Sequence, residues 1–158
     1  MLYESAGERD ERFMRQALEE ARRAAEEDEV PIGAVIVHKG TIIARAHNLT
    51  ERLKDVTAHA EMQAITAAAG HLGGKYLRDC TLYVSVEPCP MCAGAIGWAQ
   101  IPRIVYGTSD PRRGYTTLLA PGITTGPKTP LHPKATVTAG VLEDECKEIM
   151  RNFFLKRR

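Results

Sequence analysis

The sequence predicts an α/β fold in which helices cover both faces of a central mixed sheet. Amphipathic helical segments alternate along the chain with short, apolar, β-branched runs, and this order favours a sheet between two helical layers. Two of the runs are separated only by Lys39–Gly40, so they form a hairpin and make the sheet mixed. With 158 residues and no internal repeat, we expect one domain spanning 1–158.

The first helix is predicted in residues 11–29, where apolar side chains recur at helical spacing with charges opposite. Its apolar stripe comprises Phe13, Met14, Ala17, Leu18, Ala21, Ala24 and Ala25. The hairpin follows in residues 31–48. The alanine-rich segment 57–70 predicts a second helix, with Thr57 as its N-cap and Gly70 at its end.

The second half of the chain continues the alternation. Residues 80–86 predict a buried strand, and residues 89–100 predict a short helix whose first turn tolerates proline. Further strands are expected in 103–108 and near 135–139. The segment 142–158 predicts a last helix, because its acids come first and its bases last, as the helix dipole favours.

The segment between the last two strands differs from the rest. Residues 108–134 contain five of the nine prolines, together with glycines and many threonines, so no long element is expected there. Loops of this length in a compact domain are usually functional rims or disordered segments.

Bulk properties narrow the cellular setting. The N-terminus is charged from the start and lacks the apolar core of a signal peptide, and no apolar run approaches the roughly 20 residues that span a bilayer. We therefore expect a cytoplasmic protein that does not enter membranes. Four irregularly spaced cysteines in such a chain favour metal or thiol chemistry over a disulfide framework.

Charge is unevenly distributed although the net charge is only +1. Residues 1–30 hold ten acids and five bases, whereas residues 31–158 hold ten acids and sixteen bases. The C-terminal RNFFLKRR carries four cations and no acid. Such a tail either binds phosphates and stacks on unpaired bases, or is an ordinary solvated last helical turn.

The segment VEPCPMCAG contains Cys89 and Cys92 three residues apart. This spacing occurs in redox pairs, in structural zinc sites and in catalytic metal sites. A structural zinc usually has four protein ligands, often in two pairs, and no second CxxC is present. A thioredoxin-like redox pair normally has no acid and imidazole supplied nearby by the start of another helix. The upstream TAHAE instead offers His59 and Glu61 at the start of the preceding helix.

Three ligands and one open position are the pattern of a catalytic zinc, and His59, Cys89 and Cys92 supply three. Residues three apart share one side of a helix, so both cysteines can bind one metal. Side chains in a first helical turn lean toward the N-terminus, where a metal between two helix starts is within reach. Those termini also favour the thiolate form that binds zinc.

Glu61 decides the chemistry. A zinc-bound water has a pKa near 7, and hydrolysis of an amidine-like C–NH2 bond then needs a proton moved from water to a ring nitrogen and on to ammonia. One carboxylate beside the metal can carry that proton both times. The combination of H-x-E with P-C-x-x-C is also the known signature of zinc nucleobase deaminases.

The remaining chemically notable residues have structural interpretations. Cys80 opens a strand and Cys146 sits in a helix, so we expect packed thiols. Trp98 is interpreted as a core residue. Four histidines are expected at the surface or in loops: His38, His47, His71 and His132.

Over nearly its whole length the sequence resembles the bacterial tRNA-specific adenosine deaminases of the cytidine-deaminase superfamily. The resemblance runs from FMRQALEEARRA through EVPIGAVIV, HN, TAHAE, LYVSVEPCPMCAGA and RIVYG to DECKEIMRNFF. It implies a three-layer α/β/α fold with a mixed five-stranded sheet, a homodimer, and one Zn²⁺ per subunit. It also implies hydrolysis of the wobble adenosine of a tRNA anticodon to inosine.

The resemblance extends to individual positions. It implies that Glu61 is the proton shuttle beside the three zinc ligands. Asn48 would hydrogen-bond the flipped base or its ribose, and Asp110 would touch the anticodon stem-loop. Arg157 and Arg158 would contact phosphates of that RNA. After Asp110 the sequence PRRGYTTLLAPG keeps Arg112 and Gly114 of the usual family pattern but otherwise departs from it.

Two other functions are compatible with the same residues. The first is deamination of a free nucleobase or nucleoside, guanine or cytosine/cytidine, because the GAIGWA turn also resembles free-guanine deaminases. The second is a zinc-stabilised RNA-binding module without catalysis. Glu61 argues against such a module, which needs no carboxylate beside the metal.

Overall fold

The computed structural model describes residues 3–157 and contains one mixed sheet with the strand order β2-β1-β3-β4-β5. The strands are β1 (Gly33–His38), β2 (Thr41–His47), β3 (Cys80–Val86), β4 (Arg103–Thr108) and β5 (Thr136–Ala139). The helices are α1 (Ala6–Glu26), α2 (Thr50–Leu53), α3 (Ala60–Leu72), α4 (Pro90–Trp98) and α5 (Glu143–Leu155), with a 3-10 turn η1 (Tyr115–Leu118). Strand β1 is antiparallel to both neighbours, whereas β3, β4 and β5 are parallel, which confirms the mixed sheet.

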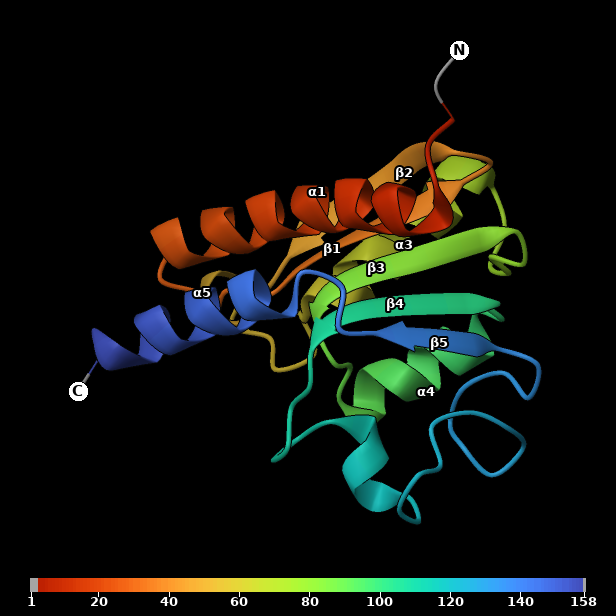
Figure 1. The fold of residues 1–158 in the computed structure, drawn as a ribbon. Helices are drawn as coiled ribbons and strands as arrows, with labels where there is room; N and C mark the ends of the chain where they lie inside the picture. The colour runs from red at the N-terminus through yellow and green to blue at the C-terminus, as the bar shows by residue number, and fades with distance from the viewer. Residues whose placement is uncertain (1–2, 158) are drawn as a thin grey trace.

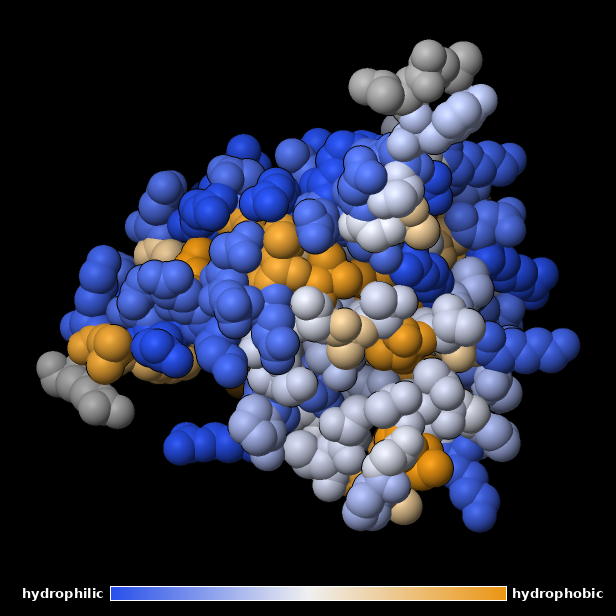
Figure 2. All heavy atoms as spheres, viewed as in Figure 1, coloured by the Kyte–Doolittle hydropathy of each residue, from blue (hydrophilic) through white to orange (hydrophobic). Residues whose placement is uncertain are grey.

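The sheet separates two helical layers (Figure 1). Helices α1 and α5 pack on one face, and α3 and α4 cover the other. Successive residues of a strand point to opposite faces, so Ala34 and Ile36 join the core under α3 while Val35 and Val37 pack against α1. The outer face of α1 is hydrophilic (Figure 2), as its amphipathic sequence predicts. The three-layer α/β/α architecture is therefore confirmed.

Helix α3 differs from the prediction at both ends. It begins after His59, so Thr57 lies two residues before the N-cap, and the Thr57 hydroxyl donates a hydrogen bond to Asp55 (2.7 Å). It passes Gly70 and ends at Gly73, whose φ of 73° lies in the left-handed region that glycine tolerates. The prediction of Thr57 as N-cap and of Gly70 as the helix end was wrong.

The prediction of a core position for Trp98 was also wrong, because its side chain is 84% exposed. Helix α4 is apolar on all sides, so composition alone does not show which side faces the sheet. Cys92, Ala93 and Ile96 are buried. Trp98 follows Ile96 by two residues, or about 200° around the helix, and so points outward.

The other predicted structural residues behave as expected. Cys80 and Cys146 are buried thiols. The other histidines lie at strand ends, near a helix end or in a loop, and none is buried: His38, His47, His71 and His132. Between β4 and β5 only the short turn η1 forms. In residues 3–157 no helix is long and apolar enough to cross a membrane.

A buried ionic cluster ties α1 to the sheet. The Asp10 carboxylate accepts hydrogen bonds from the Tyr83 hydroxyl (2.8 Å) and from two Arg103 guanidinium nitrogens (2.9 and 2.7 Å). Burial alone would raise the pKa of Asp10, but the hydrogen bonds from Arg103 and Tyr83 outweigh it and lower that pKa. Asp10 therefore stays ionised and links three elements of the fold.

Replacing Asp10 with alanine is expected to lower the free energy of unfolding by about 3 kcal/mol, because the partly buried Arg103 loses the buried carboxylate with which it pairs. Since the folded pKa of Asp10 lies below its unfolded value, the stabilisation is complete above about pH 4 and is lost as the pH falls through the lowered pKa. Urea denaturation at neutral and acidic pH measures both effects. Glu11→Ala, at an exposed neighbouring position, serves as control.

Candidate metal centre and its pocket

The first turns of α3 and α4 converge and bring together the three predicted metal ligands. His59 is the N-cap of α3 and Cys89 is the N-cap of α4, both with extended backbone. Cys92 lies one turn into α4 and is buried. The helix starts therefore orient all three side chains toward one point, as the spacing of the two motifs predicts.

The distances fit a zinc ion. The Nδ1 atom of His59 lies 3.6 Å from the Cys89 Sγ and 3.5 Å from the Cys92 Sγ. Tetrahedral bonds of about 2.3 Å to sulfur and about 2.05 Å to nitrogen would place such ligand atoms about 3.5 Å apart. All three donor atoms lie within 4.8 Å of one another. One imidazole and two thiols also match the ligand preference of zinc.

The titratable groups of this centre perturb one another. A hydrogen bond with Cys92 and the contact with His59 lower the pKa of Cys89 to about 4, so Cys89 is a thiolate at neutral pH. The hydrogen bond with Cys89 and burial raise the pKa of Cys92. Glu61 is only 3% exposed, and burial raises its pKa to about 7. The centre thus combines a thiolate, an imidazole and a buried acid.

A cavity of about 640 Å³ opens onto this centre, and we call it the metal-site pocket. Its size suits a nucleobase with its sugar. His59, Glu61 and Cys89 lie in its wall, together with two predicted substrate-binding residues, Asn48 and Asp110. Helix α5 contributes Lys147, Met150 and Phe154, and the loop after β4 contributes Arg112 and Arg113.

Asn48 connects the hairpin to the start of α3. It is buried, and its Oδ1 accepts a hydrogen bond from the Ala60 amide (2.9 Å). This bond satisfies one of the free amides at the helix N-terminus and holds the turn that carries His59 and Glu61. Asn48 therefore lies in the metal-site pocket and also positions the ligands, and its hydrogen bond to a base or ribose stays a prediction.

Glu29 is a positioning residue that the sequence analysis missed. It is fully buried, and its carboxylate accepts hydrogen bonds from the amides of Glu51 (3.0 Å) and Arg52 (2.8 Å). These bonds cap the short helix α2, which the sequence did not predict. Thr50 of α2 lines the metal-site pocket. An acid directly before the apolar VPIGAV segment was the available signal.

Glu87 was missed as well and organises the opposite wall. Its buried carboxylate accepts hydrogen bonds from the Asp110 amide (3.1 Å), the Thr116 amide (3.1 Å) and the Thr116 hydroxyl (2.8 Å). A Cβ atom at Gly114 would lie 2.1 Å from the Glu87 Oε2, so only glycine allows this approach. The position of Glu87 directly before Pro88–Cys89 was the only sequence signal.

Replacing Glu87 with alanine is expected to release the loop after β4. Loss of a charged acceptor costs about 1–3 kcal/mol, so the amides of Asp110 and Thr116 should exchange about tenfold faster or more. Hydrogen–deuterium exchange measures this directly, and Gly114→Ala should reproduce it. Glu143→Ala, at an exposed position of α5, is the control. Unchanged exchange in both pocket variants would contradict this positioning role.

Asp110 lies at the mouth of the pocket but uses its carboxylate locally. Its Oδ1 accepts hydrogen bonds from the amides of Arg112 and Arg113, both at 3.0 Å. These bonds fix the turn that carries Arg112 and Arg113, both of which line the pocket. The structure thus brings Asp110 into the pocket together with Asn48, His59 and Glu61.

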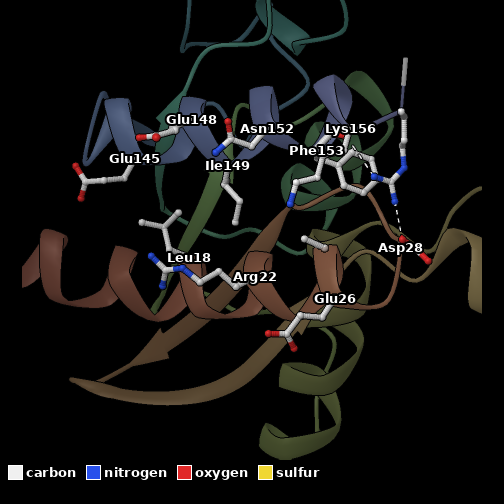
Figure 3. A pocket seen from close by; sticks show the side chains of 12 residues that line it. Leu18, Arg22, Glu26, Asp28, Glu145, Glu148, Ile149, Asn152, Phe153 and Lys156 are labelled. Carbon is white, nitrogen blue, oxygen red and sulfur yellow. Dashed lines mark hydrogen bonds and ion pairs between the residues drawn. The ribbon is translucent and has the colours of Figure 1, made fainter.

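Arg157 lies elsewhere, in a groove of about 590 Å³ between α1 and α5 (Figure 3). Its guanidinium donates a hydrogen bond to Asp28 (2.8 Å) and stacks on the Phe153 ring, 3.5 Å from the centroid. The structure therefore does not bring Arg157 to the metal-site pocket. Arg158 lies outside the described residues.

The α/β/α fold with a His-Cys-Cys centre and a buried carboxylate defines a zinc-dependent enzyme of the deaminase class. The family model for the cytidine and deoxycytidylate deaminase zinc-binding region matches residues 7–108. The chain belongs to this family.

Relatives and solved structures agree with that assignment. The tRNA-specific adenosine deaminase of Agrobacterium fabrum is 47% identical over 92% of this chain and 94% of its own. The chloroplastic tRNA(adenine(34)) deaminase of Arabidopsis thaliana is 47% identical over 94% of this chain. The matched region makes up only 12% of that longer protein.

Among solved structures, one from a study of A-to-I editing by tRNA:A34 deaminases at the wobble position of transfer RNA is 45% identical. Its TM-score is 0.77, over 87% of this chain and 98% of its own. The guanine deaminase of Bacillus subtilis is 44% identical with a TM-score of 0.60, over 63% of this chain and 64% of its own.

Proposed function

We propose that the protein hydrolyses the wobble adenosine of a tRNA anticodon to inosine and releases ammonia. The observation that carries the proposal is the buried Glu61 beside the His59–Cys89–Cys92 centre, in a pocket large enough for a nucleoside. The substrate is inferred from relatives named tRNA deaminases, which align over 92–94% of the chain. At nearly equal identity (45% and 44%), the tRNA:A34 deaminase structure aligns over 87% of the chain and the Bacillus subtilis guanine deaminase over 63%, which favours RNA over a free base.

The chain's own residues account for the proton movements. His59, Cys89 and Cys92 would hold zinc, which lowers the pKa of water so that it can attack a carbon near neutral pH. A Glu61 carboxylate oxygen takes a proton from that water and delivers it to N1 of adenine. It then carries the second proton to the departing N6 as the C6–N6 bond breaks, leaving a carbonyl at C6.

Asn48 and the pocket walls orient the base in this proposal. The Oδ1 of Asn48 is occupied by the Ala60 amide, so its side-chain NH2 is the group available to the base or ribose. Burial of Glu61 shields its carboxylate from bulk water, which strengthens each polar contact made there. The target nucleotide must leave its stack to reach Glu61.

We also propose a homodimer that uses the outer face of α4. Met91, Ala95 and Trp98 recur there at helical spacing, and Met91 and Trp98 are exposed. An apolar stripe on a helix without charged residues favours burial against a second copy. Trp98→Glu should shift the sedimentation coefficient toward that of a monomer, whereas Tyr76→Glu, at another exposed aromatic position, should not.

Residues 1–158 are proposed to act as one deaminase domain in the cytoplasm. All four cysteines are free, which suits a reducing compartment. A cytoplasmic location also places the protein with its proposed tRNA substrate.

The proposal is tested with an anticodon stem-loop that carries a wobble adenosine, assayed for inosine by nucleoside analysis. Guanine, cytosine and cytidine are assayed in parallel for ammonia release. Inosine at the wobble position alone is the expected result. Ammonia from a free base without inosine would move the protein to nucleobase salvage. Stem-loop binding without any turnover would identify an RNA-binding module.

A further inference from the structure

Three cations line the mouth of the metal-site pocket, and we call them the cation rim: Arg112, Arg113 and Lys147. All three are exposed. Within residues 3–157 none of their side chains forms an ion pair, a hydrogen bond or a cation–π contact. By contrast, Arg103 is bound to Asp10, and Arg157 to Asp28 and Phe153. The rim therefore holds cations that remain available to a ligand.

The rim is held by a defined backbone. Asp110 fixes the turn by accepting hydrogen bonds from the amides of Arg112 and Arg113, and Glu87 fixes Asp110 through its own amide. Lys147 comes from α5, so the cations approach the mouth from two separate elements. The acidic neighbours Glu87 and Asp110 are engaged with backbone amides, which leaves the positive charges exposed.

A cation rim around a pocket for a neutral base indicates a ligand with phosphates outside the pocket. When one nucleotide of a strand is flipped inward, the phosphates on both sides of it stay at the mouth. Arginine guanidinium groups bind phosphate through paired hydrogen bonds, and lysine adds a point charge. Met150 and the half-exposed Phe154 line the same mouth and offer an apolar surface for a neighbouring base.

We propose that Arg112, Arg113 and Lys147 grip the phosphates that flank the flipped nucleotide and so select an RNA strand over a free base or nucleoside. This proposal rests on the proposed function, because it deepens the choice of substrate at the same pocket. It gives the loop after β4, which keeps Arg112 of the family pattern but otherwise departs from it, a specific part in RNA recognition.

The test measures the dissociation constant of a fluorescent anticodon stem-loop as a function of salt. Arg112→Gln combined with Arg113→Gln should weaken binding about tenfold and flatten the plot of log K against log salt by about 0.7 for each lost phosphate contact. Lys147→Gln, on a different element, should flatten the plot by about 0.7, which corresponds to one lost phosphate contact. Lys39→Gln, in the β1–β2 turn at the opposite end of the sheet, should match the wild type.

Unchanged salt slopes in both rim variants would overturn the rim proposal. Binding is measured without turnover, so this result is separate from the inosine assay. If the wild type makes inosine but the rim variants keep the wild-type salt slope, only the rim proposal is refuted and the proposed function stands. For variants that bind weakly, raising the stem-loop concentration should restore kcat while KM stays elevated. A lowered kcat at saturation with unchanged affinity would also count against a phosphate grip.

Discussion

Glu61→Gln is expected to lower kcat for inosine formation by between about 100-fold and about 10,000-fold. Glutamine keeps the shape and the burial of the side chain but can neither accept the proton from water nor deliver it to ammonia. The zinc content of the purified variant should remain that of the wild type, because Glu61 is not among the three metal ligands. Single-turnover inosine assays and metal analysis measure the two quantities.

The two readouts separate a lost proton shuttle from a lost metal. Glu11→Gln, a matched change at an exposed position of α1, should leave kcat unaltered. If Glu61→Gln turned over at the wild-type rate, the proton-transfer scheme would be wrong. Loss of zinc together with activity would instead make Glu61 part of the metal site and remove the basis for its assigned role.

Removal of zinc is the second change with a large expected effect. Dialysis against a chelator should abolish inosine formation, and added Zn²⁺ should restore it. Loss of a residue that only hydrogen-bonds to a metal ligand weakens metal binding about 10–100-fold. Cys89→Ser removes a thiolate ligand itself, so it should weaken zinc binding by more than that. Cys89 is also the ligand whose lowered pKa keeps it a thiolate.

Cys80→Ala is the matched control, since Cys80 is a buried thiol of β3 outside the centre. It should bind one zinc per chain and make inosine at the wild-type rate. Full zinc content in Cys89→Ser, or zinc loss in Cys80→Ala, would contradict the ligand assignment. Full activity after complete removal of the metal would exclude the zinc-dependent mechanism.

The sequence by itself determined the sheet, its hairpin and the metal centre. Strand bounds were predicted closely because apolar β-branched runs bounded by turns are local signals, as in β3 and β4. The metal ligands were predicted for a related reason. Cys89 and Cys92 are related by the helical repeat, and His59 precedes an equally clear helix, so local geometry already aims them at one point.

Only the tertiary structure showed which side chains bind backbone amides that are far away in the sequence. Glu29 and Glu87 bind amides that lie more than twenty residues away, and a lone acid in a sequence carries no mark of such partners. The start of α3 depends on the distant Asn48 and not on a local cap.

The exposure of Trp98 and the positions of the cations have the same origin. An all-apolar helix such as α4 has no intrinsic inner face until the sheet selects one. Arg157 pairs with Asp28, whereas Arg112 and Lys147 face the pocket, because packing of α5 and of the loop after β4 assigns each charge its neighbours. Spacing along the chain specifies local geometry, but the partner of a buried or exposed charge is decided by which distant segments the fold brings together.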